Sequence, residues 1–153
     1  MTSSVQTTTV TVNDRHSLLA PYDYARRAPG RVLVIDDDEG VRAIMQKQLA
    51  YAGFDVTTVA SGAQGLDTLR AEPSIQLVLL DMMMPGMDGW GFRQAQLADA
   101  ALSHIPAVVL TGAPLPSLVH EQLQAADYLL KPVGRDHLVS VVTNFCEPTA
   151  QAA

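Results

Sequence analysis

The sequence predicts an α/β fold in which five parallel strands form one doubly wound sheet with five helices on its faces. Short apolar runs alternate with segments whose apolar residues recur at helical spacing. The runs are apolar at consecutive positions, which is typical of strands buried on both faces of a parallel sheet. The chain has 153 residues, 48% of them hydrophobic and 17% charged, which is enough for one domain with a sizeable core.

The five predicted strands are short, and each ends at or near a polar residue. They are RVLVI (31–35), FDVTTV (54–59), IQLVLL (75–80), PAVVL (106–110) and DYLL (127–130). Because a single helical segment separates each strand from the next, right-handed crossovers would make the strands parallel. Their carboxyl ends would then share one edge of the sheet, where such folds bind ligands at the point of strand-order reversal.

The five predicted helices are recognised by their apolar positions. In chain order these are Val41, Ile44, Met45, Leu49 and Ala52; Ala63, Leu66 and Leu69; Phe92, Ala95 and Leu102; Leu118, Val119 and Leu123; and Leu138, Val141, Val142 and Phe145. Gly53 suits the left-handed position that ends a helix, and Ser61 suits an N-cap. Pro114 and Pro116 remove backbone donors where the fourth helix should begin, so we expect that helix to be short or displaced.

The termini differ in composition from the rest of the chain. Ser and Thr occupy seven of the first twelve positions, so residues 1–29 are predicted to be an N-terminal extension. Its composition favours a disordered tail, while the strand propensity of TTTVTV leaves open the addition of a strand to a sheet edge. Residues 30–146 are the predicted domain and residues 147–153 a short C-terminal tail, so we expect a stand-alone domain.

Charge and composition exclude several classes of function. The net charge is −6 and only Lys47 and Lys131 are lysines, so direct DNA binding is not expected. No apolar run approaches the roughly 18 residues of a membrane span, and the N-terminus has no secretory signal pattern. Cys146 is the single cysteine, which excludes an internal disulfide and fits a cytoplasmic protein.

Polar side chains gather where the predicted strands end. The first strand runs into four consecutive acids, residues 36–39, and the third runs into Asp81. Thr111 follows the fourth strand and Lys131 the fifth. Taken singly, acids at the start of a helix are often only partners for its dipole, and each of the other residues fits turn chemistry. Together they predict one polar site at the carboxyl edge of the sheet.

The acids at this edge indicate a metal ion. Two carboxylates about 4 Å apart repel by about 4 kcal/mol at the effective dielectric of a protein surface, so Asp36, Asp37 and Asp81 need compensation. Mg²⁺ fits best, because it prefers oxygen ligands and leaves room for phosphate oxygens. Calcium is less favoured since no EF-hand spacing occurs, and zinc since no His or Cys cluster lies near. Asp81 could then act as a nucleophile that forms an aspartyl phosphate, with Lys131 and Thr111 completing a phosphoryl site.

These residues resemble the receiver domain of bacterial two-component response regulators. The resemblance covers about residues 30–146 and is carried, in order, by the Asp pair at 36–37, DMMMPGMDG (81–89), TG (111–112) and YLLKP (128–132). It implies a flavodoxin-like fold and a phosphoacceptor that catalyses its own phosphotransfer, rather than an enzyme. It also implies a sensor histidine kinase or a histidine phosphotransfer protein as phosphodonor, and a downstream protein target that the sequence does not identify.

By this resemblance, Asp81 is the phosphoacceptor. Asp37 is a direct Mg²⁺ ligand, Asp36 acts largely through water, and the backbone carbonyl of Met83 is a third ligand. The resemblance leaves the pathway open.

The resemblance also assigns a switch. Lys131 would pair with the phosphoryl oxygens, Thr111 would bond to them, and the orientation of Tyr128 would follow that of the threonine. For Tyr128, an ordinary half-buried aromatic is an equally good interpretation. Met83 and Ala113 stand where relatives often carry polar side chains near the hydrolytic water, so we expect slow autodephosphorylation.

Two other functions fit parts of the sequence. A haloacid-dehalogenase-type phosphatase would use Asp36 as nucleophile and Asp38 as acid, but that family places an acidic pair after its lysine. Here only Asp136 and Glu147 follow Lys131, and the DMMMPGMDG motif would have no task. A degenerate receiver that acts only as a binding module is the other alternative, and the filled acidic, Thr and Lys positions speak against it.

Overall fold

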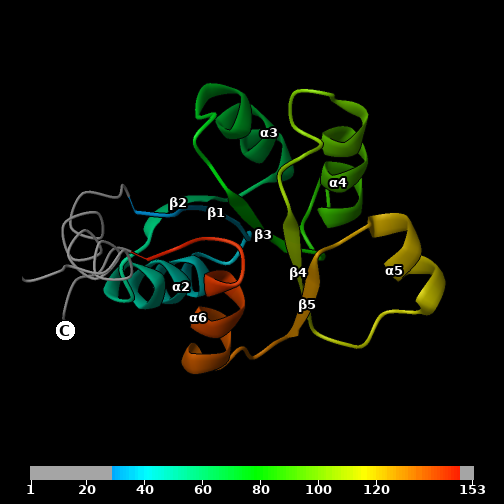
Figure 1. Ribbon diagram of the computed structural model, residues 1–153. Coiled ribbons are helices and arrows are strands. Elements are labelled where there is room, and N and C mark those ends of the chain that lie inside the picture. Colours follow the sequence, from blue (N-terminus) through cyan, green and yellow to red (C-terminus); the bar gives the residue numbers. More distant parts are fainter. Residues whose placement is uncertain (1–28, 149–153) are drawn as a thin grey trace, which may run out of the picture.

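Five parallel strands form one sheet with the order β2-β1-β3-β4-β5, as Figure 1 shows. The computed structural model describes residues 29–148, so the expectations for residues 1–28 and 149–153 lie outside the described part. The strands are β1 (Arg31–Ile35), β2 (Asp55–Val59), β3 (Leu77–Asp81), β4 (Ala107–Thr111) and β5 (Asp127–Leu130). The predicted parallel, doubly wound sheet is confirmed, with strand ends shifted by at most two residues from those expected.

The central strands are the most deeply buried part of the fold. β3 and β4 are buried at every position, and β1 at all but its first, whereas the edge strands β2 and β5 are only partly covered. Ile35 lies opposite Leu80 in the β1–β3 pairing, and Asp81 opposite Leu110 in the β3–β4 pairing. The residues that follow β1 and β3 therefore start from neighbouring points on one edge of the sheet.

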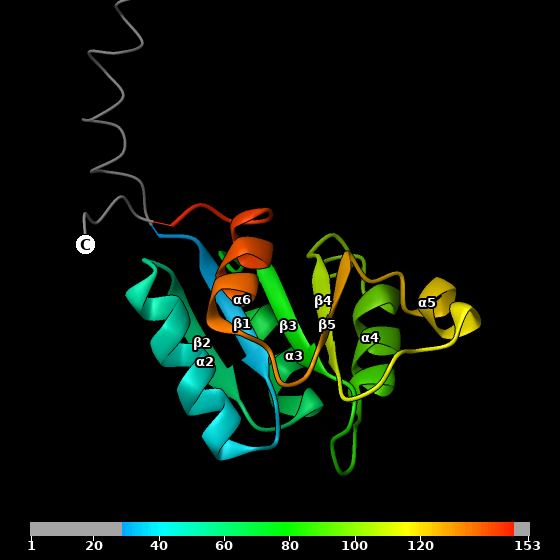
Figure 2. The ribbon, with the colours of Figure 1, turned by 90° about the horizontal axis from the view of Figure 1, so that it is seen from below.

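The helices are α2 (Glu39–Tyr51), α3 (Gly62–Ala71), α4 (Gly89–Ala98), α5 (Ser117–Leu123) and α6 (Arg135–Thr143). Four of them cover the two faces of the sheet, whereas α5 lies beyond β5 and beside α4, as Figures 1 and 2 show together. The apolar residues of α2 and α6 share one core cluster with Val32 and Val34, whereas those of α3 and α4 share another with Leu33 and Ile35. Alternate residues of β1 thus face opposite layers, as a strand with side-chain period two must.

Most of the predicted helix signals are confirmed, but three of the predicted apolar positions lie outside the helices, among them Ala52, which is the C-cap of α2. The Ser61 hydroxyl accepts a hydrogen bond from the Gln64 amide as the N-cap of α3, and Gly53 has a φ of 99° after α2. Leu102 and Phe145, however, lie beyond the ends of α4 and α6. Both still pack on the core, so the apolar spacing continues through the turns after the helices have ended. The helix expected to be short, α5, has seven residues and no side-chain bond at its Pro116 N-cap.

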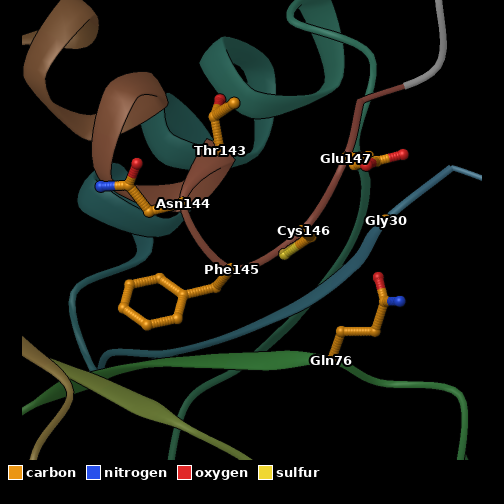
Figure 3. A pocket seen from close by; sticks show the side chains of 7 residues that line it. All are labelled: Gly30, Gln76, Thr143, Asn144, Phe145, Cys146 and Glu147. Carbon is orange, nitrogen blue, oxygen red and sulfur yellow. The ribbon is translucent and has the colours of Figure 1, made fainter.

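The two ends of the domain meet at the amino edge of the sheet. The Gly30 amide donates a hydrogen bond to the Glu147 carbonyl at 2.9 Å. A hollow of about 540 Å³ lies here, and Figure 3 shows Gln76, Phe145 and Cys146 at its wall. Burial raises the pKa of the Cys146 thiol to about 11, so this thiol is protonated at neutral pH.

Within residues 29–148, no helix has the length and apolarity needed to cross a membrane.

We expect Gly65→Ala to lower the free energy of unfolding by about 2 kcal/mol. A Cβ at this position in α3 would lie 3.0 Å from the Phe92 ring and would collide with the Ile35 side chain, both fully buried. Overpacking costs up to about 3 kcal/mol, and the better helix propensity of alanine offsets about 1 kcal/mol. Urea unfolding measures the difference. Gly40→Ala in α2 is the control, since its Cβ would approach only the exposed Asp38 side chain; equal stabilities would contradict the close packing of α3.

Candidate functional site

Three carboxylates meet at the carboxyl edge of the sheet. Asp36 follows β1, Asp37 comes next, and Asp81 ends β3, the strand paired with β1. One carboxylate oxygen from each lies within 4.8 Å of those of the other two. Asp36 and Asp81 are buried residues, at 0% and 4% exposure, whereas Asp37 is exposed. The predicted convergence of these acids is therefore confirmed.

Lys131 supplies the positive charge of this cluster. Its Nζ lies 2.8 Å from Oδ2 of Asp36 and 3.2 Å from Oδ1 of Asp81. The residue follows β5, and its amide donates a hydrogen bond to the Thr111 carbonyl at 2.8 Å, which fixes the backbone from which the side chain extends. One ammonium thus bridges two buried carboxylates that come from different strands.

The electrostatics of the cluster follow from burial and crowding. Burial and then the charge of Asp36 raise the pKa of Asp81, although Lys131 and the Met83 amide oppose this shift. Burial alone would lower the pKa of Lys131, but its hydrogen bond to Asp36 and the charges of both acids outweigh burial and raise it. Lys131 is therefore held in its charged form, yet a single ammonium does not compensate three acids.

The donor atoms in this cluster fit a magnesium ion. All are carboxylate oxygens, and the exposed side chain of Asp37 leaves one side open to the several waters that Mg²⁺ retains. Oδ2 of Asp36 receives the Lys131 ammonium, and Oδ1 accepts the Asp38 amide at 2.9 Å. The Met83 amide donates to Oδ1 of Asp81 at 3.3 Å, which places the backbone of residue 83 beside the acid. Within residues 29–148, the hydrogen bond and the ion pair of the Asp81 side chain both use Oδ1, which leaves Oδ2 without either.

The neighbouring acids have a structural role, and one arginine was missed. Asp38 is the N-cap of α2 and accepts a hydrogen bond from the Val41 amide at 3.1 Å, so for this residue the helix-partner interpretation is right. The Arg42 guanidinium donates to the Asp36 carbonyl at 2.7 Å and stabilises the chain between β1 and α2. One feature of the sequence pointed to it: Arg42 lies one turn after the cap on the helix that starts at the site.

Thr111 and Tyr128 are placed differently from the charged residues. Thr111 ends β4, the strand next to β3, and its hydroxyl donates to the Ala113 carbonyl at 2.7 Å. The Tyr128 hydroxyl donates to the His120 carbonyl of α5 at 3.2 Å, and its ring lies 4.0 Å from the His120 ring. The structure thus brings Asp36, Asp37, Asp81 and Lys131 together, with Thr111 on the adjoining strand, while Tyr128 contacts α5.

A family model and several relatives match this chain. The model of the response regulator receiver domain matches residues 32–143. The two-component response regulator ORR11 of rice, Oryza sativa subsp. indica, is 33% identical over 108 residues, which cover 69% of this chain and 74% of that protein. The probable transcriptional regulator ycf27 of Porphyridium aerugineum is 36% identical over 110 residues, which cover 71% of this chain but only 44% of that protein.

Solved structures agree with the sequence matches. The chemotaxis protein CheY4 of Vibrio cholerae superposes with a TM-score of 0.72 at 25% identity, over 77% of this chain and 99% of that one. A CheY-like receiver domain protein of Methanospirillum hungatei superposes with a TM-score of 0.66 at 36% identity, over 75% and 92% of the two chains. Both similarities extend over most of residues 29–148.

Asp37→Asn should weaken Mg²⁺ binding by about tenfold or more, because it removes one of the three carboxylates that would face the ion. Thermal unfolding with and without Mg²⁺ measures this, since a bound ion raises the melting temperature by an amount that grows with the logarithm of the ion concentration divided by Kd. Without Mg²⁺, the variant should be at least as stable as the wild type, because one repelling charge is gone.

Asp38→Asn is the matched control for this experiment. It removes the adjacent acid, which caps α2, and asparagine caps a helix about as well. An Asp38→Asn protein that loses the Mg²⁺ effect, together with an Asp37→Asn protein that keeps it, would contradict the assignment of the site.

Proposed function

Because the chain belongs to the response regulator receiver domain family, we propose that it accepts a phosphoryl group on Asp81 in a Mg²⁺-dependent phosphorelay reaction. The observation that carries this proposal is the bridge of Lys131 to Asp36 and Asp81 at 2.8 and 3.2 Å. A lysine that lies beside both acids can neutralise the oxygens of a phosphoryl group attached to this cluster. The phosphodonor in this proposal is a phosphohistidine on a sensor kinase or on a histidine phosphotransfer protein.

The reaction is a transfer between two side chains. A free oxygen of Asp81 attacks the phosphorus, the new O–P bond forms as the N–P bond breaks, and the imidazole nitrogen of the donor keeps the bond electrons. Asp37 directly, Asp36 largely through water and the Met83 carbonyl would hold the Mg²⁺, whose charge would lower the repulsion between the phosphoryl group and the acids. Lys131 meets the oxygens of the arriving group, since its ammonium already lies beside the nucleophile.

In this proposal, phosphorylation changes the hydrogen bonds of the neighbouring loop. The modification adds close to two negative charges at Asp81, which draw Lys131 and the Thr111 hydroxyl toward them. To reach a phosphoryl oxygen, that hydroxyl would have to leave the Ala113 carbonyl, to which it donates at 2.7 Å. The loop between β4 and α5 would lose this hydrogen bond. Tyr128, which is hydrogen-bonded to α5, would then change its orientation. A downstream protein would read the altered surface.

The alternative functions are less well supported. A phosphatase of the haloacid dehalogenase type needs Asp38 as acid, but that carboxylate is engaged in the cap of α2. Its nucleophile would be Asp36, which is fully buried and paired with Lys131. A degenerate receiver would lack part of the acidic cluster or its lysine, and here both are present.

We expect the wild type to become phosphorylated when it is incubated with a small phosphodonor and Mg²⁺, and Asp81→Asn not to, because asparagine lacks the nucleophilic oxygen. A phosphate-affinity gel detects the product as a shifted band, and Asp38→Asn should shift like the wild type. Decay of the band should be slow, because the side chains of Met83 and Ala113 cannot orient a water for hydrolysis. A half-life of seconds with Mg²⁺ present would contradict this last point.

Two outcomes of this experiment would favour the alternatives. The absence of a shifted band for the wild type would support a binding module without phosphotransfer. Sustained turnover of a generic phosphomonoester that Asp36→Asn abolishes and Asp81→Asn does not would favour the phosphatase.

Lys131→Ala should separate phosphorylation from its consequence. The variant should still shift on the gel, since Asp81 is unchanged, but the loop at residues 112–116 should respond less, because only the Thr111 hydroxyl remains of the two groups that the new charge attracts. Amide hydrogen exchange of this loop before and after phosphorylation measures the response. A variant whose loop responds as that of the wild type does would rule out Lys131 as the sensing group.

A further inference from the structure

A buried arginine holds the end of α5. Arg93 lies on α4 and is 4% exposed, although its side chain is charged. Its Nε donates to the Leu123 carbonyl at 2.8 Å, and a terminal nitrogen donates to the Gln124 carbonyl at 2.7 Å. These are the last carbonyls of α5, the negative end of the helix dipole, so a cation here is favourable as well as hydrogen-bonded.

The arginine is fixed in turn by a buried glutamine one turn further along α4. The other terminal nitrogen of Arg93 donates to Oε1 of Gln96 at 2.7 Å. Gln96 is fully buried, and its amide nitrogen donates to the carbonyls of Leu102 and Ile105 at 3.1 and 2.9 Å. The network therefore joins the end of α5 to α4 and to the turn that leads into β4. Because every partner is satisfied, the whole network resists displacement.

The backbone at this end of α5 is held in an uncommon conformation. Gln124 has a φ of 48°, in the left-handed region that glycine usually occupies after a helix. A non-glycine residue persists there when its surroundings determine it, and here Arg93 binds its carbonyl. The Tyr128 hydroxyl adds a bond to the His120 carbonyl in the same turn.

Within residues 29–148, the opposite end of α5 has no comparable hydrogen-bonded support. Pro116 is the N-cap and makes no side-chain bond to the helix, and Pro114 has no amide hydrogen to donate. Residues 112–114 and 116–118 are exposed. Two hydrogen bonds connect this segment to the site: the Thr111 hydroxyl donates to the Ala113 carbonyl at 2.7 Å and accepts from the Ala113 amide at 3.3 Å.

We propose that Arg93 is a positioning residue that fixes the C-terminal end of α5 as a pivot, so that the helix opens and moves at its Pro116 end. In the unphosphorylated chain, this pivot describes the spontaneous opening of α5. Where phosphorylation of Asp81 drives the movement of the helix, the inference rests on the proposed function. The movable part is then the segment from residue 112 to residue 119, which carries the exposed side chain of Leu118.

Amide hydrogen exchange on the full chain tests the pivot. In the unphosphorylated wild type, peptides covering residues 112–119 should exchange faster than those covering residues 120–126. Arg93→Met, which keeps the length but removes the donors, should speed exchange at 120–126 by about tenfold and abolish this gradient, because charged hydrogen bonds to two carbonyls are lost. After treatment with a small phosphodonor and Mg²⁺, the wild type should change at 112–119 only, and Arg93→Met at 112–126.

Two further variants make the test specific. Arg70→Met removes an arginine from the neighbouring helix α3 that is half exposed and paired with Asp67 and Asp99, and it should leave the exchange at 112–126 unchanged. Adding Gln124→Gly to Arg93→Met should restore part of the lost protection, since glycine adopts the left-handed conformation without strain. If Arg93→Met merely loosened the core, adding Gln124→Gly would not restore the protection.

Each failure points to a different claim. If the phosphate-affinity gel shows no phosphorylation, the proposed function fails, while the gradient in the unphosphorylated chain still decides the pivot. A wild type without the gradient, or an Arg93→Met protein with wild-type exchange at 120–126, would overturn the pivot. Should Arg93→Met not fold, Tyr128→Phe removes one bond from the same turn; unchanged exchange there would also count against it.

Discussion

The mutual repulsion of Asp36, Asp37 and Asp81 is the constraint around which this molecule is arranged. Their oxygens lie within 4.8 Å of one another, and two of the three side chains are buried. Such a cluster is tolerated only with nearby positive charge, which Lys131 provides in part and a divalent cation could complete. The parallel strand order is what makes the cluster possible, because it sets the ends of β1 and β3 side by side with β4 and β5 next in line. An imbalance of charge is thus built into the edge of the sheet, and a phosphoryl group would change it.

The arrangement connects this edge to α5 by short steps. The Lys131 amide bonds the Thr111 carbonyl, the Thr111 hydroxyl bonds the Ala113 carbonyl, and the chain then enters α5 through Pro116. At the far end of α5, Arg93 and Gln96 join the helix to the core. A helix with one firm and one weak end can have two arrangements that differ little in free energy, which is the property that a charge-driven switch requires.

The sequence was sufficient for the parts of the fold that repeat a simple pattern. The five strands, the Ser61 cap and the meeting of Asp36, Asp37, Asp81 and Lys131 follow from apolar runs and the polar residues that end them. Helix ends were less predictable, because Leu102 and Phe145 continue the apolar spacing beyond α4 and α6. The Arg93–Gln96 network could not be predicted, since a charged residue on an amphipathic helix is normally solvated and its acceptors are backbone carbonyls. The orientation of Tyr128 likewise depends on packing against α5.

The hydrogen bond between Gly30 and Glu147 means that the polypeptide enters and leaves the folded unit at almost one point. That point lies on the amino edge of the sheet, where Figure 3 shows Gly30 and Glu147, whereas the acids lie at the carboxyl ends of β1 and β3. Units with adjoining ends tolerate circular permutation and grafting into a surface loop of a host protein. This domain could therefore be inserted into such a loop with its acidic edge facing outward, and joining residues 30 and 147 by a short linker would distort neither the sheet nor the acidic cluster.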